Sequence, residues 1–380
     1  MTKIEFFKHS LSKINISSLK NIIKSNIITS GNYGIEVEKK LCKFFQSKHA
    51  LLTNSWTNGA IATLLALNIK KGDEVIVPAM TFVATANVVE IVGAKPVFVD
   101  CDPDTLLIDN EKILKAINKK TKAIFVVHLY GNMFNVKKLK NSLRAKKLKV
   151  TIIEDAAHSF ESKFDGKNVG TYSDVSIFSF YATKNITCAE GGAIITNNKK
   201  LYNLINQTRS HGLSKNFTQR FYSKNYSHWD MNILGTKANL PDILASFLPN
   251  QIDNIYQNLE KRKKAYFFYK TKLNNQNIKF QKIDKRCLSA LHLFPIQVKS
   301  GIRDNLLNYL NKNNIGCTVN YKAVTELNYY KKKYNLKSSS FKNSIIWGKG
   351  TISLPFYPNI KRADQIYVIK KLKEGLKKYD

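Results

Sequence analysis

The chain has 380 residues, of which 43% are hydrophobic and 23% are charged, a composition typical of a folded globular protein with a large core. Its net charge of +34 comes from basic residues spread along the whole sequence, without a helix-turn-helix, zinc-finger or RRM signature, so no nucleic-acid partner is expected. The sequence also lacks an apolar run of about 18 residues, a signal-peptide pattern and a CxxC pair among its five cysteines, so we expect no membrane insertion, a cytoplasmic location, no disulfide framework and no metal site.

Seven short runs between residues 49 and 197 have the composition of β-strands. Several are apolar throughout, as expected for strands that are covered on both faces of a sheet. Helix-compatible segments at 58–67, 81–92 and 109–118 lie between them. The seven runs are HALLTN (49–54), DEVIVPA (73–79), AKPVFVD (94–100), KAIFVVHLY (122–130), VTIIED (150–155), DVSIFSF (174–180) and GAIITN (192–197).

Alternating strands and helices predict an α/β fold, with a mostly parallel seven-stranded sheet covered by helices and a ligand site at the carboxyl ends of the strands. We expect a large domain over residues 1–252, whose N-terminal segment 1–35 borders the site. A smaller α+β domain should follow over residues 253–380. It opens with a long basic helical pattern, and SALHLFPIQV at 289–298 is predicted to form a strand.

An acid and a lysine follow two of these strands. Asp155 ends the run VTIIED, and Lys184 follows the next strand in FSFYATKNITCAEGG (178–192). A lone aspartate at a strand end would most simply cap the next helix. Together, however, the two residues supply what pyridoxal phosphate requires: a carboxylate that keeps the pyridine nitrogen protonated and an amine that forms a Schiff base with the aldehyde.

A phosphate group would also need a cradle. In TNSWTNGAIATLLAL (53–67) a strand ends and a helix begins near Thr57, Asn58 and Gly59, so hydroxyls and free N–H groups could bind phosphate there. Many helices begin with such residues, so the pattern alone is weak. Phe82, in PAMTFVATAN (78–87), follows another strand end and either packs in the core or lies flat on an aromatic ring.

These motifs resemble the pyridoxal-phosphate-dependent sugar aminotransferases of the DegT/StrS type, within fold type I of the aspartate aminotransferase superfamily. The resemblance extends from ITSGNYGIEVEKKL (28–41) to SLPFYP (353–358). It is most specific in FSFYATKNITCAEGGAIITNN (178–198), which is similar to the branch making UDP-4-amino-4-deoxy-L-arabinose.

The resemblance implies a role for each matching position. Lys184 would be the Schiff-base lysine, Asp155 the partner of the pyridine nitrogen and Phe82 the stacking aromatic. His158 would lie under or beside the cofactor. Thr57, Asn58 and Ser179 would hold its phosphate.

The family also implies a homodimer with shared active sites. An asparagine of the neighbouring subunit often reaches the phosphate, and here Lys237 occupies that position, where it could act as a point charge. The donor would be L-glutamate and the acceptor a phosphorylated keto sugar or ketone.

The substrate side departs from the family. A motif that usually resembles HYxPxH is here Asn320–Thr325, so both histidines and the proline are missing. We expect the substrate pocket to border this segment and the turn 29–31. The candidate substrate residues are Thr29, Ser30, Gly31, Arg220, Asn320, Tyr321 and Lys322.

Several functions fit these motifs to different degrees. The first is transamination of a keto sugar nucleotide for capsule, lipopolysaccharide or other surface glycan biosynthesis. The same chemistry could act on a small phosphorylated ketone such as dihydroxyacetone phosphate. A sugar dehydratase is disfavoured because such relatives replace the lysine with histidine. The intact Asp155 and Lys184 argue against a catalytically silent regulatory protein.

Overall fold

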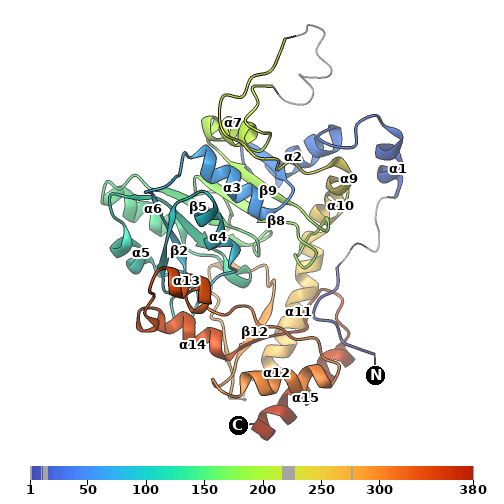
Figure 1. Ribbon diagram of the computed structural model, residues 1–380. Helices are drawn as coiled ribbons and strands as arrows, with labels where there is room; N and C mark the ends of the chain where they lie inside the picture. Colours follow the sequence, from blue (N-terminus) through green and yellow to red (C-terminus); the bar gives the residue numbers. More distant parts are fainter. Residues whose placement is uncertain (1, 10, 12–15, 216–226, 275–276, 380) are drawn as a thin grey trace.

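The structure, a computed structural model, describes residues 2–9, 11, 16–215, 227–274 and 277–379 (Figure 1). A seven-stranded sheet lies at its centre, in the order β1-β9-β8-β5-β4-β2-β3. Neighbouring strands run parallel except in the two pairs that include β9, so the predicted mostly parallel sheet is confirmed. The strands are β1 (His49–Thr53), β2 (Glu74–Pro78), β3 (Lys95–Val99), β4 (Thr121–Val127), β5 (Thr151–Asp155), β8 (Val175–Ser179) and β9 (Gly192–Thr196).

Helices cover both faces of this sheet, which explains why several of its strands are apolar on both faces. Along a strand, successive side chains point to opposite faces. Val75 and Val77 of β2 therefore join one core cluster, and Ile76 between them joins another. On the first face lie α3 (Trp56–Ala66), α4 (Ala84–Ile91) and α7 (Lys199–Thr208); on the other lie α2 (Asn32–Phe45), α5 (Asn110–Ala116), α6 (Val136–Ala145) and α10 (Leu248–Asp253).

Helix α2 is preceded by α1 (Ile16–Lys24) and is tied to the short helix α9 (Asp242–Ala245). The buried Asp242 carboxylate accepts hydrogen bonds from the N–H groups of Gly31 (2.9 Å), Tyr33 (3.2 Å) and Gly34 (3.3 Å). A side chain from another part of the chain thus satisfies the free N–H groups at the start of α2. This contact fixes the turn at residues 29–31.

The long helix α11 (Ile255–Leu273) leads from this region to a second, three-stranded sheet in the order β10-β12-β13 (Figure 1). That sheet has its own apolar cluster, formed with the helices packed beside it. Its elements are β10 (Lys279–Phe280), β12 (Phe294–Gln297), β13 (Thr351–Leu354), α12 (Arg303–Lys312) and α15 (Arg362–Tyr379).

The strand expected at 289–298 is shorter than predicted. Only Phe294–Gln297 forms β12. The N–H groups of Ala290 and His292 instead donate to the carbonyl oxygens of Gly131 (3.2 Å) and Tyr130 (3.0 Å), so this half of the run packs beside the large sheet. The two halves of this apolar run therefore pack against different sheets.

The segment between α12 and β13 also returns to the large sheet. Val324 and Tyr330 belong to the same core cluster as α3 and α4. This segment contains α13 (Asn328–Lys333) and α14 (Lys342–Gly350). A small sheet in the order β11-β6-β7 provides another link between the two regions, through β6 (Lys163–Phe164), β7 (Lys167–Asn168) and β11 (Cys287–Leu288).

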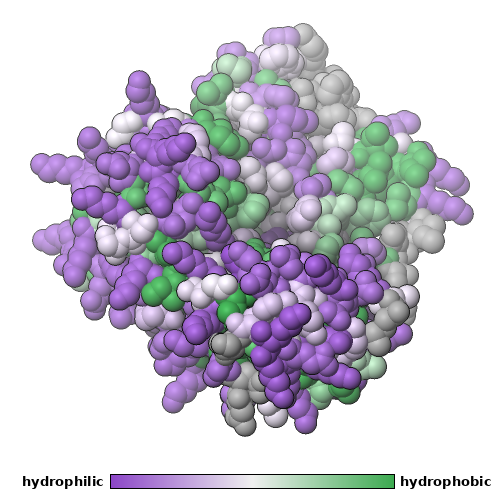
Figure 2. All heavy atoms as spheres, turned by 60° about the horizontal axis from the view of Figure 1, so that its bottom comes forward, coloured by the Kyte–Doolittle hydropathy of each residue, from purple (hydrophilic) through white to green (hydrophobic). Residues whose placement is uncertain are grey.

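Hydrophilic side chains cover most of the face shown in Figure 2. Among the helices that the structure describes, none combines the length and the apolar character needed to cross a membrane.

Candidate active site

Asp155 and Lys184 meet in one cavity at the carboxyl edge of the large sheet. Asp155 is the last residue of β5 and pairs with Val127 of β4 and Ile177 of β8. Lys184 lies in the turn after β8, where its N–H donates to the Tyr181 carbonyl (2.9 Å). Both residues line a cavity of about 450 Å³, which we call the inner cavity. The sequence predicted this meeting, because neighbouring parallel strands end at the same edge.

The N-terminus of α3 forms one end of the inner cavity. Ser55 caps the helix and accepts a hydrogen bond from the Asn58 N–H (3.0 Å). Gly192 of β9 lies so close that a Cβ there would be 2.8 Å from the Trp56 nitrogen, so only glycine lets the strand pass the helix start. Thr57 and Ser179 also line the cavity. Free N–H groups of the first helical turn and nearby hydroxyls make this end suitable for a phosphate.

Asp155 lies at another part of the cavity wall and is 5% exposed. Burial raises the pKa of its carboxyl group. This effect is opposed by hydrogen bonds from the Ala157 N–H (3.2 Å) and the Thr85 hydroxyl (2.9 Å), and by the positive charge of Lys184. The carboxylate is therefore held in place by two donors and faces a cationic partner.

The Lys184 amine has a pKa below the usual range for a lysine. Burial lowers its pKa to about 8, and the negative charge of Asp155 partly opposes that shift. A lysine with this pKa has an appreciable neutral fraction near physiological pH. It can therefore act as a nucleophile or accept a proton.

His158 is buried beside these groups. The Tyr130 N–H donates to its Nδ1 (3.2 Å), and its Nε2 lies 3.2 Å from the Tyr321 hydroxyl. Burial lowers the pKa of His158 well below its usual value, and the neighbouring Lys184 and His292 lower it further. The ring is therefore neutral, with its proton on Nε2, because Nδ1 accepts a hydrogen bond.

Two aromatic rings face the inner cavity. Phe82 lies in the turn before α4 and is 55% exposed, so it is not a core residue. The helix predicted to begin at residue 81 begins only at Ala84, and this leaves Phe82 free at the cavity wall. The Tyr321 ring lies 5.6 Å away from it, centroid to centroid. An open aromatic face is what a flat cofactor ring can stack on.

The structure places most of the predicted site residues in the inner cavity, but not all. Those lining it are Thr57, Phe82, Asp155, His158, Ser179, Lys184, Asn320 and Tyr321. Asn58 is not among them, because its side chain donates to Asn54 (2.9 Å). Lys322 is exposed and does not line the cavity either. Arg220 lies outside the described residues.

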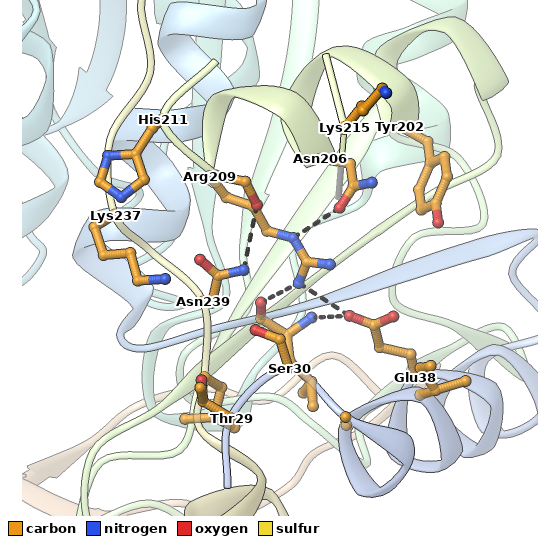
Figure 3. A pocket seen from close by; sticks show the side chains of 16 residues that line it. Thr29, Ser30, Glu38, Tyr202, Asn206, Arg209, His211, Lys215, Lys237 and Asn239 are labelled. Atoms are coloured by element: carbon orange, nitrogen blue, oxygen red, sulfur yellow. Dashed lines mark hydrogen bonds and ion pairs between the residues drawn. The ribbon is translucent and has the colours of Figure 1, made fainter. Parts of the chain in front are cut away.

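The other predicted residues, Thr29, Ser30, Gly31 and Lys237, line a second cavity of about 500 Å³, which we call the outer cavity (Figure 3). Arg209 lies in its wall and is held by Glu38 (3.0 Å) and Asn206 (3.0 Å). The Lys237 and His211 side chains have no dashed contact in Figure 3. In the part of the chain that the structure describes, therefore, neither of these two cavities borders both the turn 29–31 and the segment 320–325.

The turn between β1 and α3 lies between the two cavities. The Asn54 N–H donates to the Ala238 carbonyl (2.8 Å), and the Asn54 side chain donates to the Lys237 carbonyl (3.3 Å). Leu52, just before this turn, lines the outer cavity, whereas Ser55, just after it, lines the inner one. The Lys237 backbone thus contacts the phosphate-cradle turn, although its side chain lines the outer cavity.

A buried polar network beside Lys184 was not predicted from the sequence. The Arg262 guanidinium of α11 pairs with Glu161, whose carboxylate also accepts from the Asn185 side chain (2.8 Å). Asn185 in turn contacts His292 Nδ1 (3.0 Å), and the His292 ring stacks on His158 with centroids 4.4 Å apart. In the sequence, Arg262 lies within the basic run of α11, and nothing in that run distinguishes it from the lysines that face solvent. The only sequence signal that Arg262 is buried is its helical spacing, which places it on the same face as the apolar residues of α11.

The inner cavity fits pyridoxal phosphate. It combines an amine, a carboxylate, an exposed aromatic face and a helix N-terminus, the four features that this cofactor requires. Two of its lining residues also carry buried polar atoms without a hydrogen-bond partner, Asn320 Oδ1 and Trp56 Nε1. Among the described residues, no three His, Cys, Asp or Glu side chains gather as metal ligands.

Comparisons with known proteins agree with this geometry. A sequence profile described as the DegT/DnrJ/EryC1/StrS aminotransferase family matches residues 10–373. The uncharacterized protein MJ1066 of Methanocaldococcus jannaschii is 34% identical over 373 residues, covering 97% of this chain and 96% of its own.

Solved structures show the same similarity. Spr1654 of Streptococcus pneumoniae, a provisional sugar aminotransferase in its PMP form, is 27% identical with a TM-score of 0.93, over 99% of this chain and 100% of that chain. Helicobacter pylori PseC, an aminotransferase involved in the biosynthesis of pseudoaminic acid, is 26% identical with a TM-score of 0.90, over the whole of both chains. Spr1654 has also been solved in a PLP form. The chain therefore belongs to the DegT/DnrJ/EryC1/StrS family of pyridoxal-phosphate-dependent aminotransferases.

Proposed function

We propose that this aminotransferase moves the amino group of L-glutamate to the carbonyl carbon of a keto sugar nucleotide, in the cytoplasm, for capsule, lipopolysaccharide or other surface glycan biosynthesis. The observation that carries the proposal is the meeting of Lys184, Asp155 and the α3 N-terminus in one cavity. The solved relatives support the sugar acceptor, because Spr1654 and PseC are described as a sugar aminotransferase and as an aminotransferase of pseudoaminic acid biosynthesis.

When bound, pyridoxal phosphate supplies an aldehyde that carries the amino group and a ring that accepts electrons. Lys184 would hold the aldehyde between turnovers. Its freed amine, with a pKa lowered to about 8, would then move a proton to and from the carbon that carries the amino group. Asp155 would keep the ring nitrogen protonated.

The remaining cavity residues would hold the ring and its phosphate. Phe82 offers an exposed face on one side, and the neutral His158 lies nearby without adding a competing charge. Thr57, Ser179 and the N–H groups at the start of α3 would bind the phosphate. The buried Asn320 amide oxygen, which has no partner, would accept a hydrogen bond from the substrate.

The outer cavity supports a homodimer with shared sites. Lys237 and the turn 29–31 line it together, and neither lines the cavity that contains Lys184 in the same chain. For these residues to contact a ligand bound in an inner cavity, that cavity would have to belong to a second copy of the chain. In the dimer, Lys237 would bind the cofactor phosphate of the partner subunit. The division into domains at residues 1–252 and 253–380 is part of the same proposal.

A small phosphorylated ketone remains the second candidate acceptor, because the segment Asn320–Thr325 lacks the histidines that are usual in the family. Mass spectrometry on purified enzyme with glutamate can decide between the two. The acceptor panel would contain UDP- and dTDP-linked keto sugars and dihydroxyacetone phosphate. An aminated sugar nucleotide, absent with the Lys184→Ala variant, is the expected result. Amination of the ketose phosphate alone would contradict the sugar assignment.

A further inference from the structure

The N-terminal segment, residues 2–9, contributes to the inner cavity although it precedes the large sheet by some forty residues of sequence. Its Ile4 is 6% exposed and belongs to the core of the second sheet. The Ile4 N–H donates to the Asn314 carbonyl (2.8 Å), and the Gly316 N–H donates to the Ile4 carbonyl (2.8 Å). A third bond joins the Phe356 N–H to the Phe6 carbonyl (3.2 Å). Backbone hydrogen bonds at Ile4 and Phe6 therefore hold the segment in place.

Gly316 makes this docking possible. A Cβ at that position would lie 2.8 Å from the Phe6 nitrogen and 3.1 Å from the Ile4 carbonyl oxygen. Both are backbone atoms, which cannot rotate away as a side chain could. Any larger residue at 316 must push the N-terminal segment outward.

The docked segment places two aromatic residues, Phe6 and Phe7, in the wall of the cavity that contains Lys184. Phe6 is half-buried and packs in an apolar cluster together with Tyr321. Phe7 is 36% exposed, and its ring lies 6.4 Å from that of Phe6. Phe356 lines the same wall. This side of the cavity is thus aromatic, whereas the side at α3 also carries the hydroxyl groups of Ser55 and Thr57.

We propose that Phe7, held by the docked N-terminal segment, determines acceptor specificity by packing against the apolar C–H face of a pyranose ring. This inference rests on the proposed function and deepens it. Covering an exposed aromatic ring with an apolar surface removes both from water and lowers the free energy of the complex. A pyranose offers such a face, whereas a three-carbon ketose phosphate is polar over nearly all of its surface. The aromatic wall therefore favours a sugar acceptor over a small ketone.

The two half-reactions allow a direct test. Phe7→Ala should lower kcat/KM for a UDP-linked 4-keto-6-deoxyhexose by about tenfold, through KM, since apolar contact is lost. Phe7→Tyr keeps the ring and should behave as the wild type does. The glutamate half-reaction, followed by the absorbance change of the bound cofactor, should be the same in all three proteins, because glutamate has no pyranose face.

A binding measurement removes turnover from the comparison. Without glutamate, the pyridoxal form of the holoenzyme cannot aminate the keto sugar, so calorimetry reports its Kd. Phe7→Ala should weaken that Kd by about tenfold. Gly316→Val changes no cavity residue but displaces the segment, and it should weaken the Kd to a similar extent while the glutamate half-reaction persists.

An unchanged Kd and kcat/KM in Phe7→Ala would overturn the inference while leaving the proposed function intact. A wild-type enzyme that aminates dihydroxyacetone phosphate but none of the keto sugars would overturn the sugar assignment and this inference with it, while leaving transamination itself intact. Absence of the glutamate half-reaction in the wild type would instead overturn the proposed function, and this inference with it.

Discussion

The inner and outer cavities differ in how complete they are within one chain. The inner cavity brings together an amine, a carboxylate, an aromatic face and a helix N-terminus, each of which ends or follows a strand of the same seven-stranded sheet. The outer cavity has cationic side chains, among them Lys237 and Arg209, but contains neither Lys184 nor Asp155. The candidate catalytic groups thus lie at a single sheet edge, whereas the role that we propose for the outer residues requires a partner subunit.

The largest effect should come from Lys184. Lys184→Ala removes the amine that we propose holds the cofactor aldehyde and moves the proton, so turnover should fall to background. Borohydride reduction should then leave no cofactor covalently attached, as read by mass spectrometry. Lys146→Ala, at an exposed position after α6, is the matched control and should retain both properties. A Lys184→Ala protein that still turned over would remove the inner cavity from the reaction.

Asp155→Asn should lower kcat by about 10²- to 10³-fold, because a neutral amide cannot stabilise charge on the ring nitrogen. It should also move a pH profile. Capture of pyridoxal phosphate by the apo protein requires neutral Lys184, so its rate should rise with pH through about 8. The Asp155 charge raises the Lys184 pKa, so its removal should shift the midpoint to lower pH.

Thr85→Val is the control for that shift. It deletes one hydrogen bond to Asp155 but retains the carboxylate, so the midpoint should stay near the wild-type position. A midpoint that is the same in Asp155→Asn and in the wild type would mean that the two groups are not coupled.

Lys237→Ala should weaken cofactor binding by about 10- to 100-fold, the range for losing one charged hydrogen bond. The comparison between cavities predicts that this loss falls on the partner's site. Mixing Lys184→Ala chains with Lys237→Ala chains would then create heterodimers with one intact site. Activity at limiting cofactor should partly return. If proven subunit exchange restores nothing, Lys237 does not act across an interface.

The smallest effect is expected at Asp242, which fixes the turn beside the outer cavity. Asp242→Asn leaves one acceptor oxygen for three N–H groups, so the free energy of unfolding should fall by about 1 kcal/mol in urea titrations. Asp253→Asn breaks an exposed pair with Lys40 and should cost less. Equal losses in the two variants would show that Asp242 does not stabilise the turn.

The sequence by itself determined the α/β class, the seven sheet strands and the meeting of Asp155 with Lys184. These features depend on local pattern: apolar runs predict strands that are covered on both faces, and residues just after parallel strands share an edge. The assignment of Phe82 to the cavity wall depended on the same rule together with the family resemblance.

Only the tertiary structure decided which residues reach that edge from elsewhere. Arg262 lies in a basic run that resembles a solvated face, yet it is buried against Glu161. Phe7 lies near the start of the chain, and Asn58 turns out to contact Asn54 rather than the cavity. The positions of Arg262 and Phe7 result from packing between separate elements. The Asn58 contact is one of several hydrogen bonds that this side chain could make locally. Periodicity and spacing along the chain do not encode that choice, because it depends on which surfaces the folded chain brings together.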